Sequence, residues 1–166
     1  MSEEDYISGF LDCISRVKDI LTPQLGGTNQ FFLIDKKPKN DNLENVKRFL
    51  VKNRKSYTWI ENDLEFESWL NSISISKIND WQIELPKEIK IWTSDRELVE
   101  ISGKNGYLLS EYLVNFLLKD LFQDKEVEVF KLLPEWEKWH WGDQINQEYL
   151  FVTNDNMFIM HLGESS

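Results

Sequence analysis

The chain has 166 residues, of which 41% are hydrophobic and 13% aromatic, and its 29 acidic and 19 basic residues give a formal net charge of -10. Acidic chains that are poor in aromatic residues tend to be disordered, so the presence of seven tryptophans excludes that class here. The acidic balance also favours a cationic partner over a polyanion such as nucleic acid.

The N-terminus and the cysteine content indicate the cellular setting. The first residues have no basic or apolar region of the kind that starts a secretory signal, and no apolar run approaches the roughly 20 residues that span a bilayer. Cys13 is the single cysteine and cannot form an internal disulfide. Its apolar neighbours on a predicted helix favour a buried, unreactive thiol. These features predict a soluble, cytoplasmic protein.

The first half of the chain predicts three helices and two strands. Ser2 with Asp5, and Asp41 with Glu44, form capping boxes at the starts of two helices, and apolar residues follow each box at helical spacing. A third helix starts at residue 62 or 63, where either side chain can cap it. The strands are short apolar or β-branched runs at residues 31–34 and 56–60.

The second half predicts several strands around one long helix. Residues 72–77 fit either a helix end or a strand. A closing hairpin joins residues 148–152 and 157–162 across a four-residue loop. The other predicted strands are residues 81–85, 89–92, 98–101 and 127–132. The predicted helices are residues 107–122 and 134–141. The long helix has an apolar stripe formed by Leu109, Tyr112, Leu113, Phe116, Leu117 and Leu121.

Helices and strands are mixed without regular alternation, which is typical of the α+β class. We predict a mostly antiparallel sheet of mixed strand order, packed by about four helices, in a single globular domain that covers residues 1–166. No repeat or low-complexity linker divides the chain.

Residues 134–143 are the first candidate for a binding surface, because they combine three tryptophans with three acids. Tryptophan offers a large rigid contact area, and an acidic, aromatic surface suits a partner that presents lysine or arginine. The alternative is that these tryptophans cover the sheet as core residues. A second acidic and aromatic segment surrounds residue 63; a solvated helix face is the better interpretation of it, and its acids are an extension of the first candidate surface. The predicted partner-binding residues are Glu135, Trp136, Glu137, Trp139, Trp141, Asp143, Glu61, Asp63 and Glu65.

His140 and His161 are the two histidines of the chain, and each has carboxylates nearby in sequence. A small hydrolase that uses one of them as general base is therefore an alternative function. Neither belongs to a pair with metal-ligand spacing, so no metal and no cofactor is predicted. In the closing hairpin, His161 equally fits a half-buried side chain with satisfied hydrogen bonds.

The segment from Lys36 to Lys55 is strongly basic, with eight basic residues against two acidic ones. Tyr57 and Trp59 follow it and could stack on bases, so a nucleic-acid-associated regulatory protein is another alternative. The acidic remainder of the chain repels polyanions, which makes nucleic acid the less favoured partner.

No phosphate-binding loop, nucleophile motif or calcium loop is present in the sequence. The preferred hypothesis is a non-catalytic acidic binding protein. More specifically, we predict an inhibitor or immunity protein that neutralises a basic partner such as a bacterial nuclease toxin. Opposite charge would speed the association, and aromatic anchors would make it tight.

Overall fold

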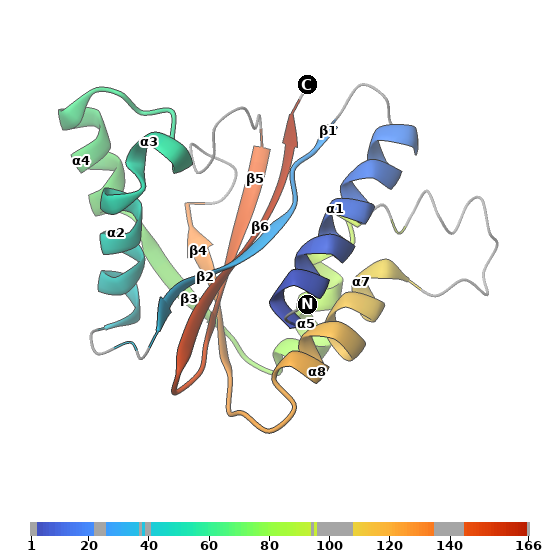
Figure 1. Cartoon of the computed structure of the whole chain (residues 1–166). Coiled ribbons are helices and arrows are strands. Elements are labelled where there is room, and N and C mark those ends of the chain that lie inside the picture. Colours follow the sequence, from blue (N-terminus) through green and yellow to red (C-terminus); the bar gives the residue numbers. More distant parts are fainter. Residues whose placement is uncertain are drawn as a thin grey trace.

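The structure, a computed structural model, describes residues 3–21, 26–36, 38, 41–93, 95, 108–134 and 145–165. Within this part of the chain, six strands form one sheet with helices on both of its faces (Figure 1). This arrangement confirms the predicted α+β class. The strands are β1 (Gly26–Gly27), β2 (Gln30–Lys36), β3 (Ser74–Ile78), β4 (Glu128–Leu133), β5 (Ile145–Val152) and β6 (Asn156–Ser165).

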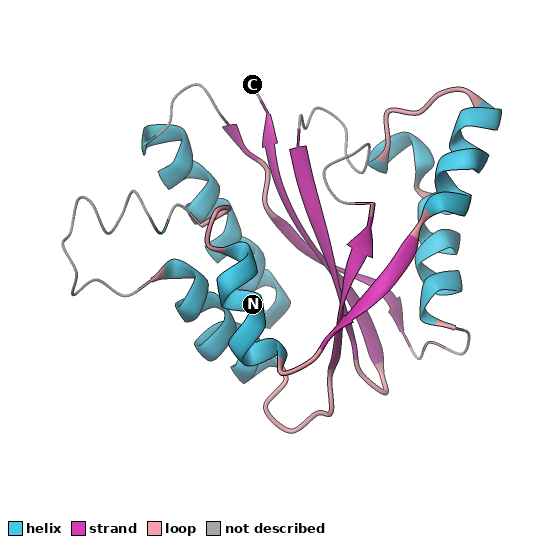
Figure 2. Cartoon of the chain, turned by 180° about the vertical axis from the view of Figure 1, so that it is seen from behind, coloured by secondary structure: helices cyan, strands magenta, loops and turns pink. Residues whose placement is uncertain are grey.

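Two groups of helices lie on opposite faces of the sheet (Figures 1 and 2). One group is α1 (Glu3–Leu21), α5 (Trp81–Ile89) and a continuous helix made of α7 (Leu109–Tyr112), η1 (Leu113–Leu118) and α8 (Lys119–Leu121). The other group is α2 (Asn42–Lys52), α3 (Arg54–Tyr57) and α4 (Asp63–Ser72). No helix in the described ranges is long and apolar enough to cross a membrane.

All neighbouring strands of the sheet are antiparallel, in the order β1/β2, β6, β5, β4, β3. β1 and β2 pair with successive parts of β6, because Gly27 lies opposite Glu164 and Phe31 lies opposite Met160. They therefore form one edge of the sheet, and β3 forms the other. β5 and β6 form the predicted hairpin, in which Val152 lies opposite Met157.

The two faces of the sheet bury separate apolar cores. On β5, Tyr149 and Phe151 point to the α1 side and Leu150 points to the α2 side, as expected from alternation along a strand. The core on the α1 side is rich in aromatic rings. The ring centroids of Phe31 and Phe158, for example, lie 5.2 Å apart. Burial of a side chain of this size stabilises the fold by roughly 1.5–3 kcal/mol.

One face of α1 supplies hydrogen-bonding partners for most of the β1/β2 edge. The backbone groups of residues 27, 29, 31 and 33 point outward from the sheet, and each bonds to a side chain of α1. Gly27 N–H donates to Asp19 Oδ1 (3.0 Å). Asn29 N–H donates to Ser15 Oγ (3.2 Å). Ser8 Oγ donates to the carbonyl oxygen of residue 31 (2.7 Å), and the N–H of residue 33 donates to Glu4 Oε1 (3.0 Å).

The close approach of α1 to this edge requires a glycine. A Cβ atom at Gly27 would lie 2.9 Å from the Cα atom of Ser15. That contact is with backbone, which cannot rotate away. The absence of a side chain at residue 27 therefore sets how near the helix lies to the sheet.

Several predicted elements are confirmed. Asp41 caps α2 by accepting hydrogen bonds from the N–H groups of Leu43 and Glu44, and Asn62 caps α4. The ambiguous segment is a strand, β3. The predicted elements at residues 98–101 and 134–141 lie outside the described residues, except for residue 134.

Three predicted strands are wrong. Residues 54–57 form a helical turn, residues 81–89 form α5, and residues 90–93 form a turn. In α5 the buried residues Trp81, Leu85 and Ile89 recur every four positions, whereas Ile83 is 61% exposed. The apolar pattern from residue 81 to 85 fits both the two-residue period of a strand and the 3.6-residue period of a helix. Packing against the core selects the helix.

Two burial predictions are also wrong. Cys13 is exposed on α1 rather than buried. Phe116, expected in the apolar stripe of the long helix, is 50% exposed. Residues 113–118 form a π-helix, whose wider turn shifts the buried positions toward Val114 and Leu118.

Candidate partner-binding surface

Arg54 holds the turn between α3 and α4. Its guanidinium group donates to the carbonyl oxygen of Ile60 (3.1 Å) and to that of Glu61 (2.6 Å). It also donates to Asp63 Oδ1 (2.6 Å), and its centre lies 4.3 Å from the ring centroid of Phe66. The planar group, with several donors in fixed directions, suits such a site. Arg54 therefore fixes the backbone that carries the acidic residues of the turn.

Acidic and apolar side chains share the outer surface of this turn. Trp59 is 42% exposed and Leu64 is 77% exposed, although both are large and hydrophobic. Their neighbours Glu61, Asp63 and Glu65 are exposed as well. We call the five residues Trp59, Glu61, Asp63, Leu64 and Glu65 the α4 acidic surface.

A depression of about 490 Å³ adjoins the α4 acidic surface. Its lining residues are Arg54, Lys55, Thr58, Ile60, Glu61 and Asp63. Ile60 makes the lining partly apolar, and two carboxylates, Glu61 and Asp63, stand among two cations, Arg54 and Lys55. Arg54 is bound to the turn and to Asp63, so the carboxylate of Glu61 is the group on which a cation of a partner could bind.

The structure brings together one part of the predicted binding site. Glu61, Asp63 and Glu65 lie on the same surface at the start of α4. The other six predicted residues, Glu135, Trp136, Glu137, Trp139, Trp141 and Asp143, lie outside the described residues, as does His140.

The predicted nucleic-acid contacts are only partly at the surface. Lys36, Arg48, Lys52 and Lys55 are exposed. Arg54 is bound within the turn, as described above. Tyr57, which was expected to stack on a base, is 4% exposed and belongs to the core on the α2 side.

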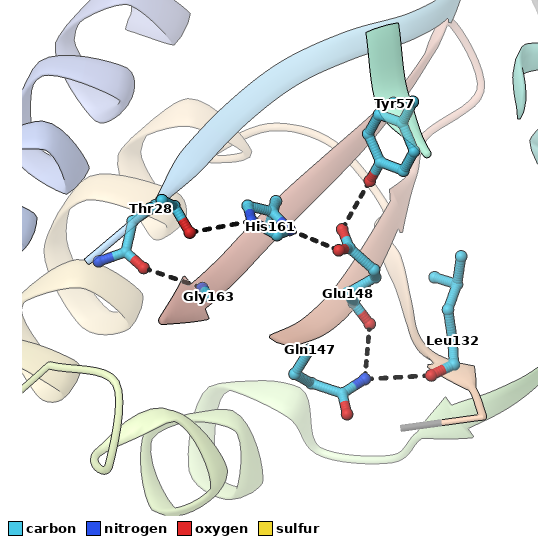
Figure 3. A network of polar contacts seen from close by, with 8 residues as sticks. Thr28, Tyr57, Leu132, Gln147, Glu148, His161 and Gly163 are labelled. Atoms are coloured by element: carbon cyan, nitrogen blue, oxygen red, sulfur yellow. Dashed lines mark hydrogen bonds and ion pairs between the residues drawn. The ribbon is translucent and has the colours of Figure 1, made fainter. Parts of the chain in front are cut away.

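Tyr57 belongs to a buried polar cluster on the sheet (Figure 3). Glu148 on β5 lies opposite His161 on β6, and both side chains have no exposed surface. Glu148 Oε1 lies 2.5 Å from Nδ1 of the histidine, and Oε2 accepts a hydrogen bond from the tyrosine hydroxyl group (2.8 Å). On the other side of the ring, Nε2 lies 3.5 Å from Oγ1 of Thr28. Each end of the imidazole is therefore occupied.

The burial of this cluster bears on the hydrolase alternative. A general base must lie within hydrogen-bond reach of the proton that it removes from a substrate. His161 is fully buried, beyond the half-buried position expected from the hairpin, so it contacts no solvent in this conformation. Among the described residues, no group of three or more histidine, cysteine, aspartate or glutamate side chains is placed to hold a metal ion.

Sequence reasoning missed two residues, Arg54 and Glu148. Arg54 counted as one of several surface cations, because residues 56–60, which lead into the turn beside it, were predicted as a strand. Glu148 carried a usable signal. The predicted hairpin places it opposite His161, so the pairing follows from the register.

No family model matches this sequence, and no curated protein is similar to it. A crystal structure of citrus MAF1 is similar to this chain over 99% of each of the two chains, with 10% sequence identity and a TM-score of 0.48. A similarity at this level carries no argument about function. The candidate surface therefore rests on its own geometry.

Proposed function

We propose that this protein is a non-catalytic binding protein that neutralises a basic protein partner. The α4 acidic surface is the observation that carries this proposal. Its carboxylates and exposed apolar side chains sit on a turn that Arg54 holds rigid. A rigid surface loses little conformational entropy on binding, which favours affinity.

The charge of the chain supports the same function. A net charge of -10 attracts a cationic protein over long distances and speeds the encounter at low salt. Carboxylates on a surface can also occupy a site that normally binds phosphates. An immunity protein that blocks a bacterial nuclease toxin in the cytoplasm is the specific form of this function that we propose.

Neither alternative gains a specific observation in its favour. Nucleic-acid binding would have to do without Tyr57 and Arg54, which are engaged inside the fold. A hydrolase based on His161 would require the buried cluster to open.

The experiment is a quantitative capture of partners from a host lysate at low and high salt. The tagged protein is compared with a Glu61→Lys/Glu65→Lys variant, which reverses two charges without touching the Arg54–Asp63 pair. A Glu111→Lys/Asp120→Lys variant is the matched control, because it makes the same change in net charge on the opposite face of the sheet.

We expect one basic protein to bind the unchanged protein and the control in stoichiometric amounts. Its association with the first variant should be slower by on the order of tenfold at low salt. The purified partner should then lose its activity, for example DNA cleavage, when this protein is added. Equal binding of both variants would show that the surface is wrong, and the absence of any basic partner would contradict the function.

A further inference from the structure

The two edges of the sheet differ in how their backbone groups are used. Side chains of α1 bond to the outward groups of the β1/β2 edge, from residue 27 to residue 33. β3 pairs with β4 on its inner side. Among the described residues, none bonds to the backbone of β3 on its outer side. Figure 2 shows β3 at this open edge, running between α4 and α5.

The side chains of β3 do not block this edge. Ser74 and Ser76 are small and exposed, and Ile75 is half-buried. Open edges are commonly protected by proline or by charged side chains such as lysine. β3 has no proline, and its single charged residue, Lys77, forms an ion pair with Glu128. Five residues at about 3.3 Å each offer roughly 16 Å of pairing edge.

Negative charge lies at both ends of β3. The C-terminus of α4, which carries the negative end of the helix dipole, precedes the strand at Ser72. At the other end, exposed Asp80 follows two residues after the strand. Glu128 on β4 is also near this end, but its charge is neutralised by the ion pair with Lys77. An added strand with cations at both of its ends would be attracted at both places. A second copy of this chain would instead bring together two net charges of -10.

We propose that β3 binds an extended cationic segment of another protein, which pairs with its outer edge as an additional strand. Backbone hydrogen bonds supply the affinity in this mode of recognition, and flanking charges select the segment. This site is distinct from the α4 acidic surface. The two lie at opposite ends of α4, which at 1.5 Å per residue are about 15 Å apart.

The test uses a capped peptide, Lys-Val-Thr-Val-Thr-Val-Lys, titrated into the isotope-labelled protein while backbone amide NMR signals are followed. Two control peptides are matched to it. One has the same sequence with N-methylated amides, which keeps the charges but removes the donors. The other has glutamate in place of both lysines.

We expect the lysine peptide to shift the amide signals of Ser74 to Ile78. The N-methylated peptide should bind at least about tenfold more weakly because it lacks backbone donors, and the glutamate peptide should be weaker by a similar factor. Replacement of Asp80 by Asn keeps a residue that tolerates the left-handed backbone there (φ 49°) and should weaken binding by a few-fold.

Three outcomes would overturn the proposal. These are the absence of shifts in β3 at millimolar peptide, equal binding of the lysine and N-methylated peptides, and shifts confined to residues 59–65. The last outcome would still support the proposed function, because it would place cation binding at the α4 acidic surface. Conversely, peptide binding at β3 would stand even if charge reversal at Glu61 and Glu65 left every partner bound.

Discussion

Arg54 offers the sharpest test of how the candidate surface is built. Arg54→Lys keeps the positive charge but removes the planar group that bonds to Ile60, Glu61 and Asp63 at once. The contact with Asp63 contributes little, because that carboxylate is 92% exposed. The two bonds to backbone carbonyls contribute roughly 1 kcal/mol each, and the contact with the Phe66 ring adds about 0.5–1 kcal/mol. Lysine can replace one bond, so we expect the free energy of unfolding to fall by about 1.5–2 kcal/mol.

Urea unfolding followed by tryptophan fluorescence measures this difference. Arg16→Lys is the matched control, because Arg16 forms an exposed pair with Asp12 on the surface of α1. The control should change the free energy of unfolding by less than about 0.5 kcal/mol. If the two variants were equally stable, Arg54 would not hold the turn, and the argument for a rigid acidic surface would fail.

Three further substitutions test other parts of the fold by the same unfolding measurement. Gly27→Ala should destabilise the protein by about 1–3 kcal/mol, because the new methyl group meets the backbone of Ser15; an unchanged midpoint would mean that α1 can move away freely. Tyr57→Phe should lower the free energy of unfolding by about 1–3 kcal/mol, because the buried carboxylate of Glu148 loses one hydrogen-bond donor. An unchanged free energy of unfolding would show that another donor replaces the hydroxyl group. Phe116→Gln should lower the free energy of unfolding by less than about 1 kcal/mol, because Phe116 is half-exposed. A decrease above about 3 kcal/mol, as expected for a core residue, would contradict the shifted buried positions of the π-helix.

Local signals predicted the elements whose causes are local. Asp41 and Asn62 cap their helices through side chains a few residues away. The hairpin of β5 and β6 follows from alternation on both sides of a short polar loop. Such features depend on neighbours in sequence, so one sequence is enough to predict them.

Elements decided by distant contacts were missed. The segment from Trp81 to Ile89 is helical because three of its residues pack against the core, and the sequence pattern alone fits a strand nearly as well. The π-helix around Phe116 has no local signature. Packing of the chain, rather than local preference, decides such segments.

The candidate site was predictable to the same degree. Glu61, Asp63 and Glu65 could be recognised as an acidic group beside aromatic residues. The role of Arg54 could not, because it depends on a turn that returns residues 60–63 to its side. Surface composition can be read from a sequence, whereas the rigidity of that surface depends on tertiary contacts.

The position of β6 has a consequence for the order of folding. β6 follows all the other described strands in the chain, yet it lies between β2 and β5. Gly27 pairs with Glu164, so the contact closes a loop of more than a hundred residues. Contacts between residues so distant in sequence slow folding, because the loop must close before any of them forms. During synthesis, α1 and β2 are complete long before their neighbour β6. Until β6 is made, the edge of β2 that pairs with β6 has no partner, whereas α1 can already bond to its other edge.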